Sequence, residues 1–228
     1  MPLVPIGRLH VLTDMHFQQR MSHAALAAAA VQGGADTVQF RHKTGTARDR
    51  LSTLAPTVEV CRAAGVPCLV DDWLDLALAT DADGVHLGAL DLPVGRARAV
   101  AQALGRPFVV GATATTAQAA VQAEADGADY VGFGPVFPTG SKANPASVKG
   151  LDGLRQACAA VSIPVVAIAG ITPERVRPCL DAGAWGVAVM TAVSTAPDPA
   201  AAAAAFRAEI DGWLSEQGGD EARPSDRG

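Results

Sequence analysis

The chain of 228 residues has few aromatic side chains, at 4% of the sequence, and only four cysteines. The cysteines are Cys61, Cys68, Cys158 and Cys179. They form no Cys-x-x-Cys pair, and no histidine stands beside them at the spacing of a metal ligand. This pattern argues against a structural zinc site and against a disulfide-rich secreted domain. We therefore expect reduced, mostly buried thiols in a cytoplasmic protein.

Long apolar runs and a strong charge of one sign are also missing. No stretch is long and apolar enough to span a bilayer, and the first residues lack the basic segment and apolar core of a secretion signal. The formal net charge is −5, which gives no indication of a nucleic-acid partner or an acidic membrane surface. We therefore expect neither a nucleic-acid partner nor a membrane partner. The sequence leaves open whether the chain forms a homo-oligomer.

Apolar runs of strand length alternate with helical stretches along the chain. The runs are continuous rather than alternating, which is typical of parallel strands covered on both faces. The predicted strands are Leu9–Thr13, Thr37–Arg41, Pro67–Val70, Gly84–Leu87, Phe108–Ala112, Tyr130–Gly134, Pro164–Ala169 and Gly186–Met190. The predicted helices between them include Ser22–Gln32, Thr46–Ala63, Trp73–Thr80, Thr116–Ala125, Gly150–Ala160, Pro173–Ala182 and Pro199–Trp213.

A short unit recurs before every second strand. It combines a helix end, a turn of small residues and a strand start, at Gly34–Val38, Asp81–Val85, Gly127–Val131 and Gly183–Val187. Four such units predict eight strands and a single-domain (βα)8 barrel, the TIM barrel, over residues 1–213. An open doubly wound sheet is the alternative, but no Gly-x-Gly-x-x-Gly follows the first strand. Residues 214–228 are polar, and we expect this tail to be disordered.

Polar side chains collect where the predicted strands end, which is the face that carries barrel active sites. The residues are Gln39, Arg41, Lys43, Asp71, Asp72, His86, Asp91, Thr113, Thr139, Ser141 and Lys142. Any single pair of these charges could be a plain salt bridge. Taken together, the carboxylates suit Mg²⁺, which bridges to phosphate oxygens, and the cations suit the remaining charge of a diphosphate.

A second set of residues suits a monophosphate. Two hydroxyls are available from Thr139 and Ser141, and Gly140 between them has no side chain to keep a ligand from the backbone. Gly170 and the Met190-Thr191 pair follow the last two strands, where barrels commonly bind phosphate through main-chain N–H groups. The sequence thus predicts two phosphorylated substrates, one of which loses a diphosphate.

These motifs resemble the thiamine phosphate synthase family. The matching segments are Gln39–Lys43, Asp71-Asp72, Gly84–Gly88 with Asp91, Gly134–Lys142, Ala169–Ile171 and Val189–Ala192. They occur in register from about Leu9 to Phe206. The resemblance implies a (βα)8 barrel that joins a hydroxymethylpyrimidine diphosphate to a thiazole phosphate and releases thiamine monophosphate and pyrophosphate.

The resemblance also implies a role for each matched position, with Mg²⁺ as the cofactor. Residues implied to bind the pyrimidine diphosphate are Gln39, Arg41, Lys43, Asp71, Thr113 and Lys142, of which Arg41, Lys43 and Lys142 are the catalytic cations. Residues implied to bind the thiazole phosphate are Thr139, Gly140, Ser141, Gly170, Met190 and Thr191. The implied metal ligands are Asp72 and Asp91.

Several positions depart from the family pattern. Asp71 replaces an asparagine, Ala89 a glutamine, Thr113 a serine, and Ala169 the first glycine of a pair. Two alternatives stay open. A thiazole tautomerase of the same family is one, although we would expect a histidine there in place of Pro135. A non-catalytic barrel that binds thiamine precursors is the other.

Overall fold

Eight parallel strands close into a barrel in the computed structural model, which describes residues 4–140 and 147–218. The strands pair in chain order, and the last one is hydrogen-bonded back to the first. They are β1 (Leu9–Thr13), β2 (Thr37–Phe40), β3 (Cys68–Asp71), β4 (Gly84–Leu87), β5 (Val109–Ala114), β6 (Tyr130–Phe133), β7 (Val165–Ile168) and β8 (Gly186–Val189). The predicted TIM barrel is confirmed, and every predicted strand boundary lies within two residues of the observed one.

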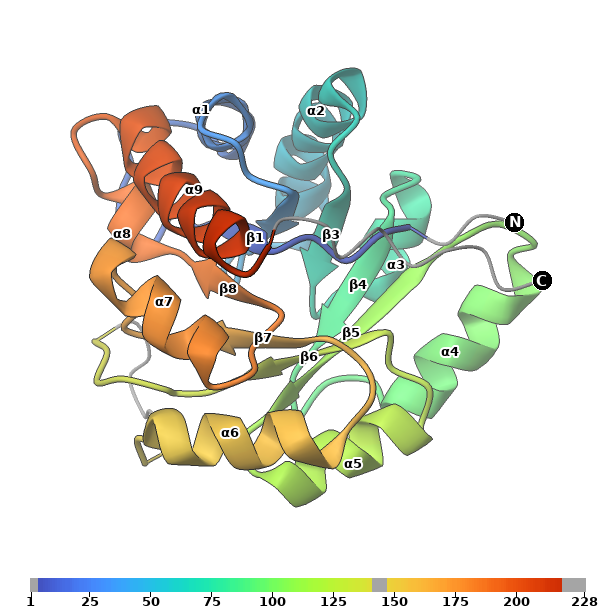
Figure 1. Ribbon diagram of the computed structural model, residues 1–228. Coiled ribbons are helices and arrows are strands. Elements are labelled where there is room, and N and C mark those ends of the chain that lie inside the picture. Colours follow the sequence, from blue (N-terminus) through green and yellow to red (C-terminus); the bar gives the residue numbers. More distant parts are fainter. Residues whose placement is uncertain (1–3, 141–146, 219–228) are drawn as a thin grey trace.

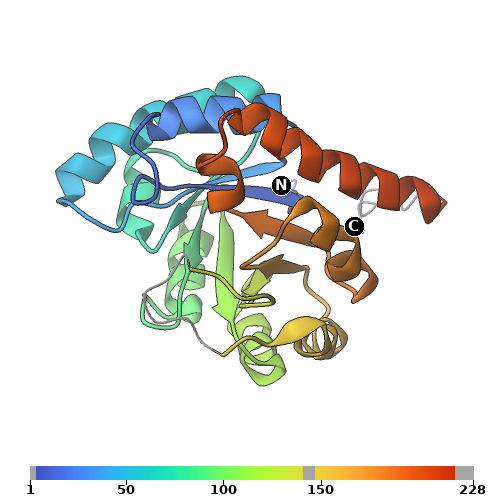
Figure 2. The same cartoon turned by 90° about the vertical axis from the view of Figure 1, so that its left-hand side faces the viewer.

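Helices surround the strands, as Figure 1 and Figure 2 show from two directions. They are α1 (His23–Gln32), α2 (Ala47–Ala64), α3 (Leu74–Ala79), α4 (Val94–Ala103), α5 (Ala117–Ala125), α6 (Gly150–Ala160), α7 (Pro173–Asp181), α8 (Thr191–Ser194) and α9 (Pro199–Glu216). The sequence analysis assigned no range to α4 or α8. Helix α9 ends three residues beyond the predicted boundary at Trp213, and residues 219–228 of the predicted tail lie outside the described part.

Local hydrogen bonds explain where several helices begin. The Thr46 side chain accepts from the Asp49 backbone at the start of α2, and the Asp49 side chain accepts from Thr46 in return. Ser22, Thr116 and Asp198 cap α1, α5 and α9 in the simpler way, with one side-chain acceptor each. These polar residues stand immediately before apolar helical stretches, so the sequence pattern located the helix starts well.

The recurring unit of the sequence has a structural role at the amino ends of the strands. Asp36, Asp83 and Asp129 each accept a backbone N–H from the start of the preceding strand, at 2.7–3.0 Å. Trp185 takes the equivalent place before β8, where its indole donates to the Ile6 carbonyl at 2.8 Å and Arg8 lies over its ring. The repeat therefore ties neighbouring strands together at the end opposite the predicted site.

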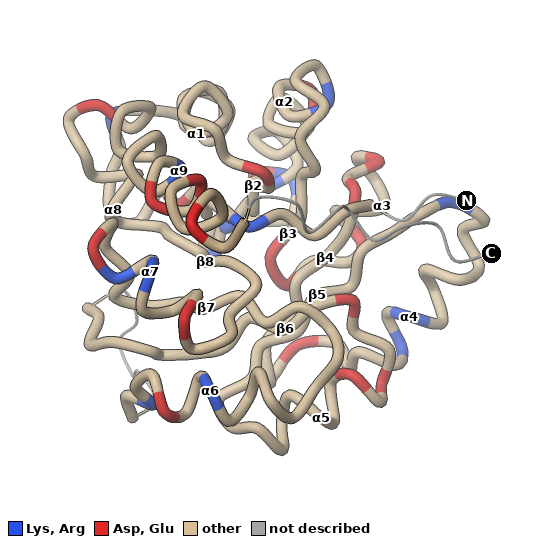
Figure 3. Tube along the Cα trace, in the orientation of Figure 1, with Lys and Arg blue, Asp and Glu red and all other residues tan. Residues whose placement is uncertain are grey.

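Most of the apolar core lies between the strands and the helices, and a smaller cluster fills the barrel interior. The interior cluster contains Leu12, Leu69, Val109, Tyr130, Val166 and Ala188. Charged residues of both signs are spread over the chain trace without a long stretch of one sign (Figure 3). Among the described residues, no helix is both long enough and apolar enough to cross a bilayer.

Candidate active site

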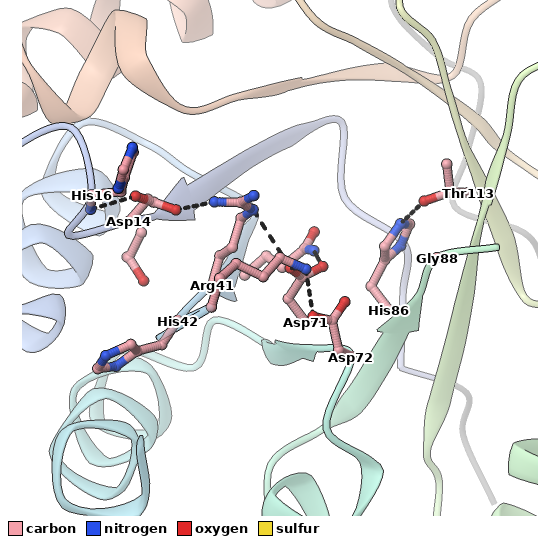
Figure 4. A network of polar contacts seen from close by, with 12 residues as sticks. Asp14, His16, Arg41, His42, Asp71, Asp72, His86, Gly88 and Thr113 are labelled. Carbon is pink, nitrogen blue, oxygen red and sulfur yellow. Dashed lines mark hydrogen bonds and ion pairs between the residues drawn. The ribbon is translucent and has the colours of Figure 1, made fainter. Parts of the chain in front are cut away.

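A connected group of charged side chains lies where β2 and β3 end (Figure 4). Gln39 on β2 donates from Nε2 to Asp71 Oδ1 at 2.9 Å. Lys43, three residues beyond β2, places Nζ 2.6 Å from Asp71 Oδ2 and also pairs with Asp72. Arg41 Nε lies 3.6 Å from the same Asp71 oxygen. The barrel thus brings together five residues that the sequence analysis predicted from separate motifs.

Asp14 is a member of this group that the sequence analysis missed. It follows β1 directly, is 2% exposed and forms an ion pair with the Arg41 guanidinium. Its other carboxylate oxygen accepts the His16 backbone N–H at 2.6 Å. Asp14 therefore holds Arg41 from the side opposite Asp71. Its place after the end of a strand is the signal that could have identified it.

Burial and charge set the protonation of the pair formed by Asp71 and Lys43. Burial raises the pKa of the Asp71 carboxyl, and the nearby Lys43 and Arg41 offset only part of that rise. Burial alone would lower the pKa of the Lys43 ammonium, but Asp71 and Asp72 outweigh it, so this pKa is raised. Lys43 therefore keeps its charge at the mouth, where it can neutralise an anionic ligand.

Asp72 and Asp91 face each other beside this group. Asp72 adopts a left-handed backbone, with φ 68°, and Asp91 Oδ2 accepts the Gly88 N–H at 2.7 Å. Desolvation raises the pKa of Asp91, and its contact with Asp72 raises it further. Two carboxylates that repel each other in this way suit a divalent cation placed between them.

The described carboxylates at this mouth do not make a complete metal cage by themselves. Among the residues that the structure describes, no group of three or more His, Cys, Asp or Glu side chains could hold a metal ion. Mg²⁺ usually keeps several waters and binds through one or two carboxylates and substrate phosphates. The buried Asp71 Oδ2, which lies 2.6 Å from Lys43 Nζ, is a further oxygen at this place. The residues present therefore fit Mg²⁺ that arrives with a diphosphate.

The loops after β6 and β7 are held side by side at the predicted monophosphate end of the site. The Val136 and Phe137 backbone N–H groups donate to the Ile168 and Ala169 carbonyls, at 3.0 and 3.2 Å. Gly170 has φ 66°, and a Cβ there would lie 2.5 Å from the Pro138 carbonyl oxygen. Only glycine fits this close approach.

Arg175 of α7 is another residue that the sequence analysis missed. It donates to the Gly170 carbonyl at 2.6 Å, and its guanidinium lies 4.6 Å from the centre of the Phe137 ring. Met190 directly precedes α8, which begins at Thr191, so this pair lies at the amino end of a helical turn. Through Gly170 and Phe137, Arg175 connects the loop after β7 with the loop after β6, the two loops at the predicted phosphate position.

The predicted residues that the structure describes fall into three groups. Gln39, Arg41, Lys43, Asp71 and Asp72 form one contact network, and Asp91 adjoins it through Asp72. Thr113 on β5 contacts His86 instead, at 2.9 Å. Thr139, Gly140, Gly170, Met190 and Thr191 lie in or next to the loops after β6, β7 and β8. Ser141 and Lys142 lie outside the described residues, so their roles stay predictions.

Known proteins have sequences similar to this chain over most of its length. The family described as thiamine monophosphate synthase matches residues 9–193. A thiamine-phosphate synthase of Salinibacter ruber is 58% identical over 92% of this chain and 92% of its own length. The corresponding protein of Methanocella arvoryzae is 46% identical over 89% of this chain and 94% of its own.

Solved structures agree with the sequence matches. The thiamine phosphate pyrophosphorylase from Pyrococcus furiosus superposes with a TM-score of 0.82 at 36% identity, over 91% of this chain and 96% of that one. A 3-hexulose-6-phosphate synthase superposes with a TM-score of 0.66 at 24% identity, which reflects the shared fold alone. On this evidence the chain belongs to the thiamine monophosphate synthase family, a family of transferase enzymes.

Proposed function

We propose that this chain joins 4-amino-2-methyl-5-hydroxymethylpyrimidine diphosphate to a thiazole phosphate, and releases thiamine monophosphate and pyrophosphate. The bond from the pyrimidine methylene carbon to the diphosphate oxygen breaks first, and its electron pair leaves with the diphosphate. The pyrimidine ring stabilises the resulting cation. The thiazole nitrogen then donates its lone pair to the methylene carbon, which forms the new C–N bond.

The observation that carries this proposal is the network of Arg41, Lys43, Asp71 and Asp72 at the ends of β2 and β3. Two cations stand within ion-pair distance of buried carboxylates, in a place where a departing diphosphate needs its charge neutralised. Lys43 keeps its proton because its pKa is raised, so it can stabilise the leaving group as a cation. Lys142 is proposed to act in the same way from the loop after β6.

We propose Mg²⁺ as the cofactor, held by Asp72 and Asp91 together with the diphosphate. When bound, the ion neutralises charge that develops on the leaving diphosphate. Asp72 is fixed for this role by its left-handed backbone and by the bond from its N–H to the His86 carbonyl, at 2.9 Å. Asp91 is fixed by the Gly88 N–H.

The thiazole phosphate is proposed to bind at the loops after β6, β7 and β8. Gly170 supports this placement because it lets the loop after β7 pack closely against Pro138 in the loop after β6, and the start of α8 adds N–H groups. Thr139 and Ser141 would contribute hydroxyls. The two substrates would then meet above the barrel interior.

A coupling assay tests the proposal. Purified protein is mixed with Mg²⁺, the pyrimidine diphosphate and the thiazole phosphate, and both products are measured. Product that depends on Mg²⁺ is expected, and Lys142→Ala should lower turnover strongly while the fold stays intact. Binding of the thiazole phosphate without any coupled product would overturn the proposal in favour of the tautomerase or the non-catalytic barrel.

A further inference from the structure

Three side chains from neighbouring strands form a line of hydrogen bonds inside the barrel. His86 of β4 lies between the other two: Nδ1 is 2.8 Å from the Tyr130 hydroxyl of β6, and Nε2 is 2.9 Å from Thr113 Oγ1 of β5. Figure 4 shows the outer half of this line, the contact from His86 to Thr113. The line runs from the buried interior to the partly exposed Thr113.

Two glycines make room for the rings. Gly111 is paired with both His86 and Tyr130 in the sheet, and a Cβ at Gly111 would lie 2.3 Å from the Tyr130 ring. Gly132 is paired with Thr113, and a Cβ there would lie 3.0 Å from His86 Cε1. The strands therefore hold both rings in place at positions where any larger residue would displace them.

The Tyr130 hydroxyl decides which nitrogen of His86 carries the proton. Tyr130 is 1% exposed, and among the described residues its hydroxyl has His86 Nδ1 as its hydrogen-bond partner. A phenol has one O–H to donate, and a buried donor without an acceptor is costly. The Tyr130 O–H therefore donates to Nδ1, which must be unprotonated, and the ring proton of neutral His86 resides on Nε2.

The direction of the next hydrogen bond follows from this assignment. With its proton on Nε2, His86 donates to Thr113 Oγ1, so the Thr113 hydroxyl is an acceptor on its inner side. Its own proton is then available to donate outward. A fully protonated His86 would also donate from Nε2, so the direction at Thr113 is the same in both charge states.

We infer that Tyr130 and His86 are positioning residues that hold Thr113 as a hydrogen-bond donor, and that the pyrimidine diphosphate presents an acceptor atom to it. The inference deepens the proposed function and rests on it. Thr113 lies near the carboxyl end of β5, and it lines one cavity of about 290 Å³ together with Asp91, one of the two proposed metal ligands, and Gln122 of α5.

The first test measures the His86 tautomer in the free protein. Protein with ¹⁵N-labelled histidine is studied by long-range ¹H–¹⁵N correlation NMR, and a His86→Gln variant identifies the His86 signals among the five histidines. The expected spectrum of neutral His86 shows a protonated Nε2 and an unprotonated Nδ1. In Tyr130→Phe this preference should weaken. A proton on Nδ1 in the unaltered protein would overturn the inference, whether or not the protein has coupling activity.

The second test is kinetic and uses Tyr130→Phe, which removes one buried oxygen that is two side chains away from the substrate. KM for the pyrimidine diphosphate should rise about tenfold, because the loss of one oriented hydrogen bond has roughly this effect on binding. KM for the thiazole phosphate should stay unchanged. Thr113→Ser retains the hydroxyl, so Tyr130→Phe should raise KM for the pyrimidine diphosphate in the Thr113→Ser background as well.

A double-mutant cycle separates positioning from general damage. In a Thr113→Val background the hydroxyl is gone, so Tyr130→Phe should have no further effect on KM for the pyrimidine diphosphate. An equal effect in both backgrounds, or an equal rise in KM for both substrates, would overturn the inference. If the unaltered protein forms no product, the proposed function fails instead, and the NMR measurement still decides the tautomer.

Discussion

Replacement of Ala169 by glycine should stabilise this protein. Ala169 has φ 82°, in the left-handed region, where a residue with a Cβ is strained by about 1–2 kcal/mol. Glycine removes the strain but gives the unfolded chain more freedom, which costs about 0.5–1 kcal/mol. The net gain is about 0.5–1 kcal/mol. For a chain of this size that corresponds to a rise of about 1–4 °C in Tm.

Thermal unfolding followed by circular dichroism measures this effect, and two variants serve as controls. Ala204→Gly makes the same replacement at an exposed site inside α9 and should lower stability by about 0.5–1 kcal/mol. Gly170→Ala introduces a Cβ 2.5 Å from the Pro138 carbonyl oxygen and should be clearly destabilising. If Ala169→Gly lowers Tm as much as Ala204→Gly does, the reasoning about strain at Ala169 is refuted.

Three further predictions concern the site and the histidines. Asp14→Asn should lower kcat/KM by about tenfold or more, because Arg41 loses the ion pair that orients it. Replacement of both Asp72 and Asp91 by alanine should abolish the Mg²⁺-dependent rise in Tm that the pyrimidine diphosphate produces. Burial lowers the pKa of His10 from 6.5 to about 4. The unfolded chain therefore binds this proton more tightly, and acidification from pH 7.5 to 5 should cost about 2 kcal/mol of folding stability through His10, a share that His10→Asn should remove. Burial lowers the pKa of His23 to about 4 as well, so His23 adds a separate loss that remains in His10→Asn.

Each of these predictions has a distinct contrary result. Normal kinetics in folded Asp14→Asn would show that Asp71 alone orients Arg41. For the double aspartate variant, Tm with the diphosphate and Mg²⁺ is compared with Tm with the diphosphate alone. If Mg²⁺ still raises Tm as it does in the unaltered protein, the proposed metal position is excluded. Urea unfolding at the two pH values tests the histidine, and an equal loss of stability in His10→Asn would mean that other groups cause the pH dependence.

The sequence located the predicted site residues by a simple rule. Side chains that follow parallel strands meet at one mouth of a closed barrel, so Gln39, Arg41, Lys43 and Asp71 could be assigned to one place from the sequence. The same rule applies to Asp14. It was missed because it is a single aspartate after the first strand, with no oppositely charged side chain near it in the sequence. Its partner, Arg41, is 27 residues away.

The sequence by itself determined the fold class, the strand boundaries and the family, because these depend on local patterns: apolar runs, small-residue turns, helix caps and contiguous motifs. The tertiary structure decided which side chains touch. The line from Tyr130 through His86 to Thr113 joins three strands, and each contact depends on the sheet register and on the room that Gly111 and Gly132 leave. Proton positions in that line follow from burial and from available partners, and these exist only once the barrel has closed.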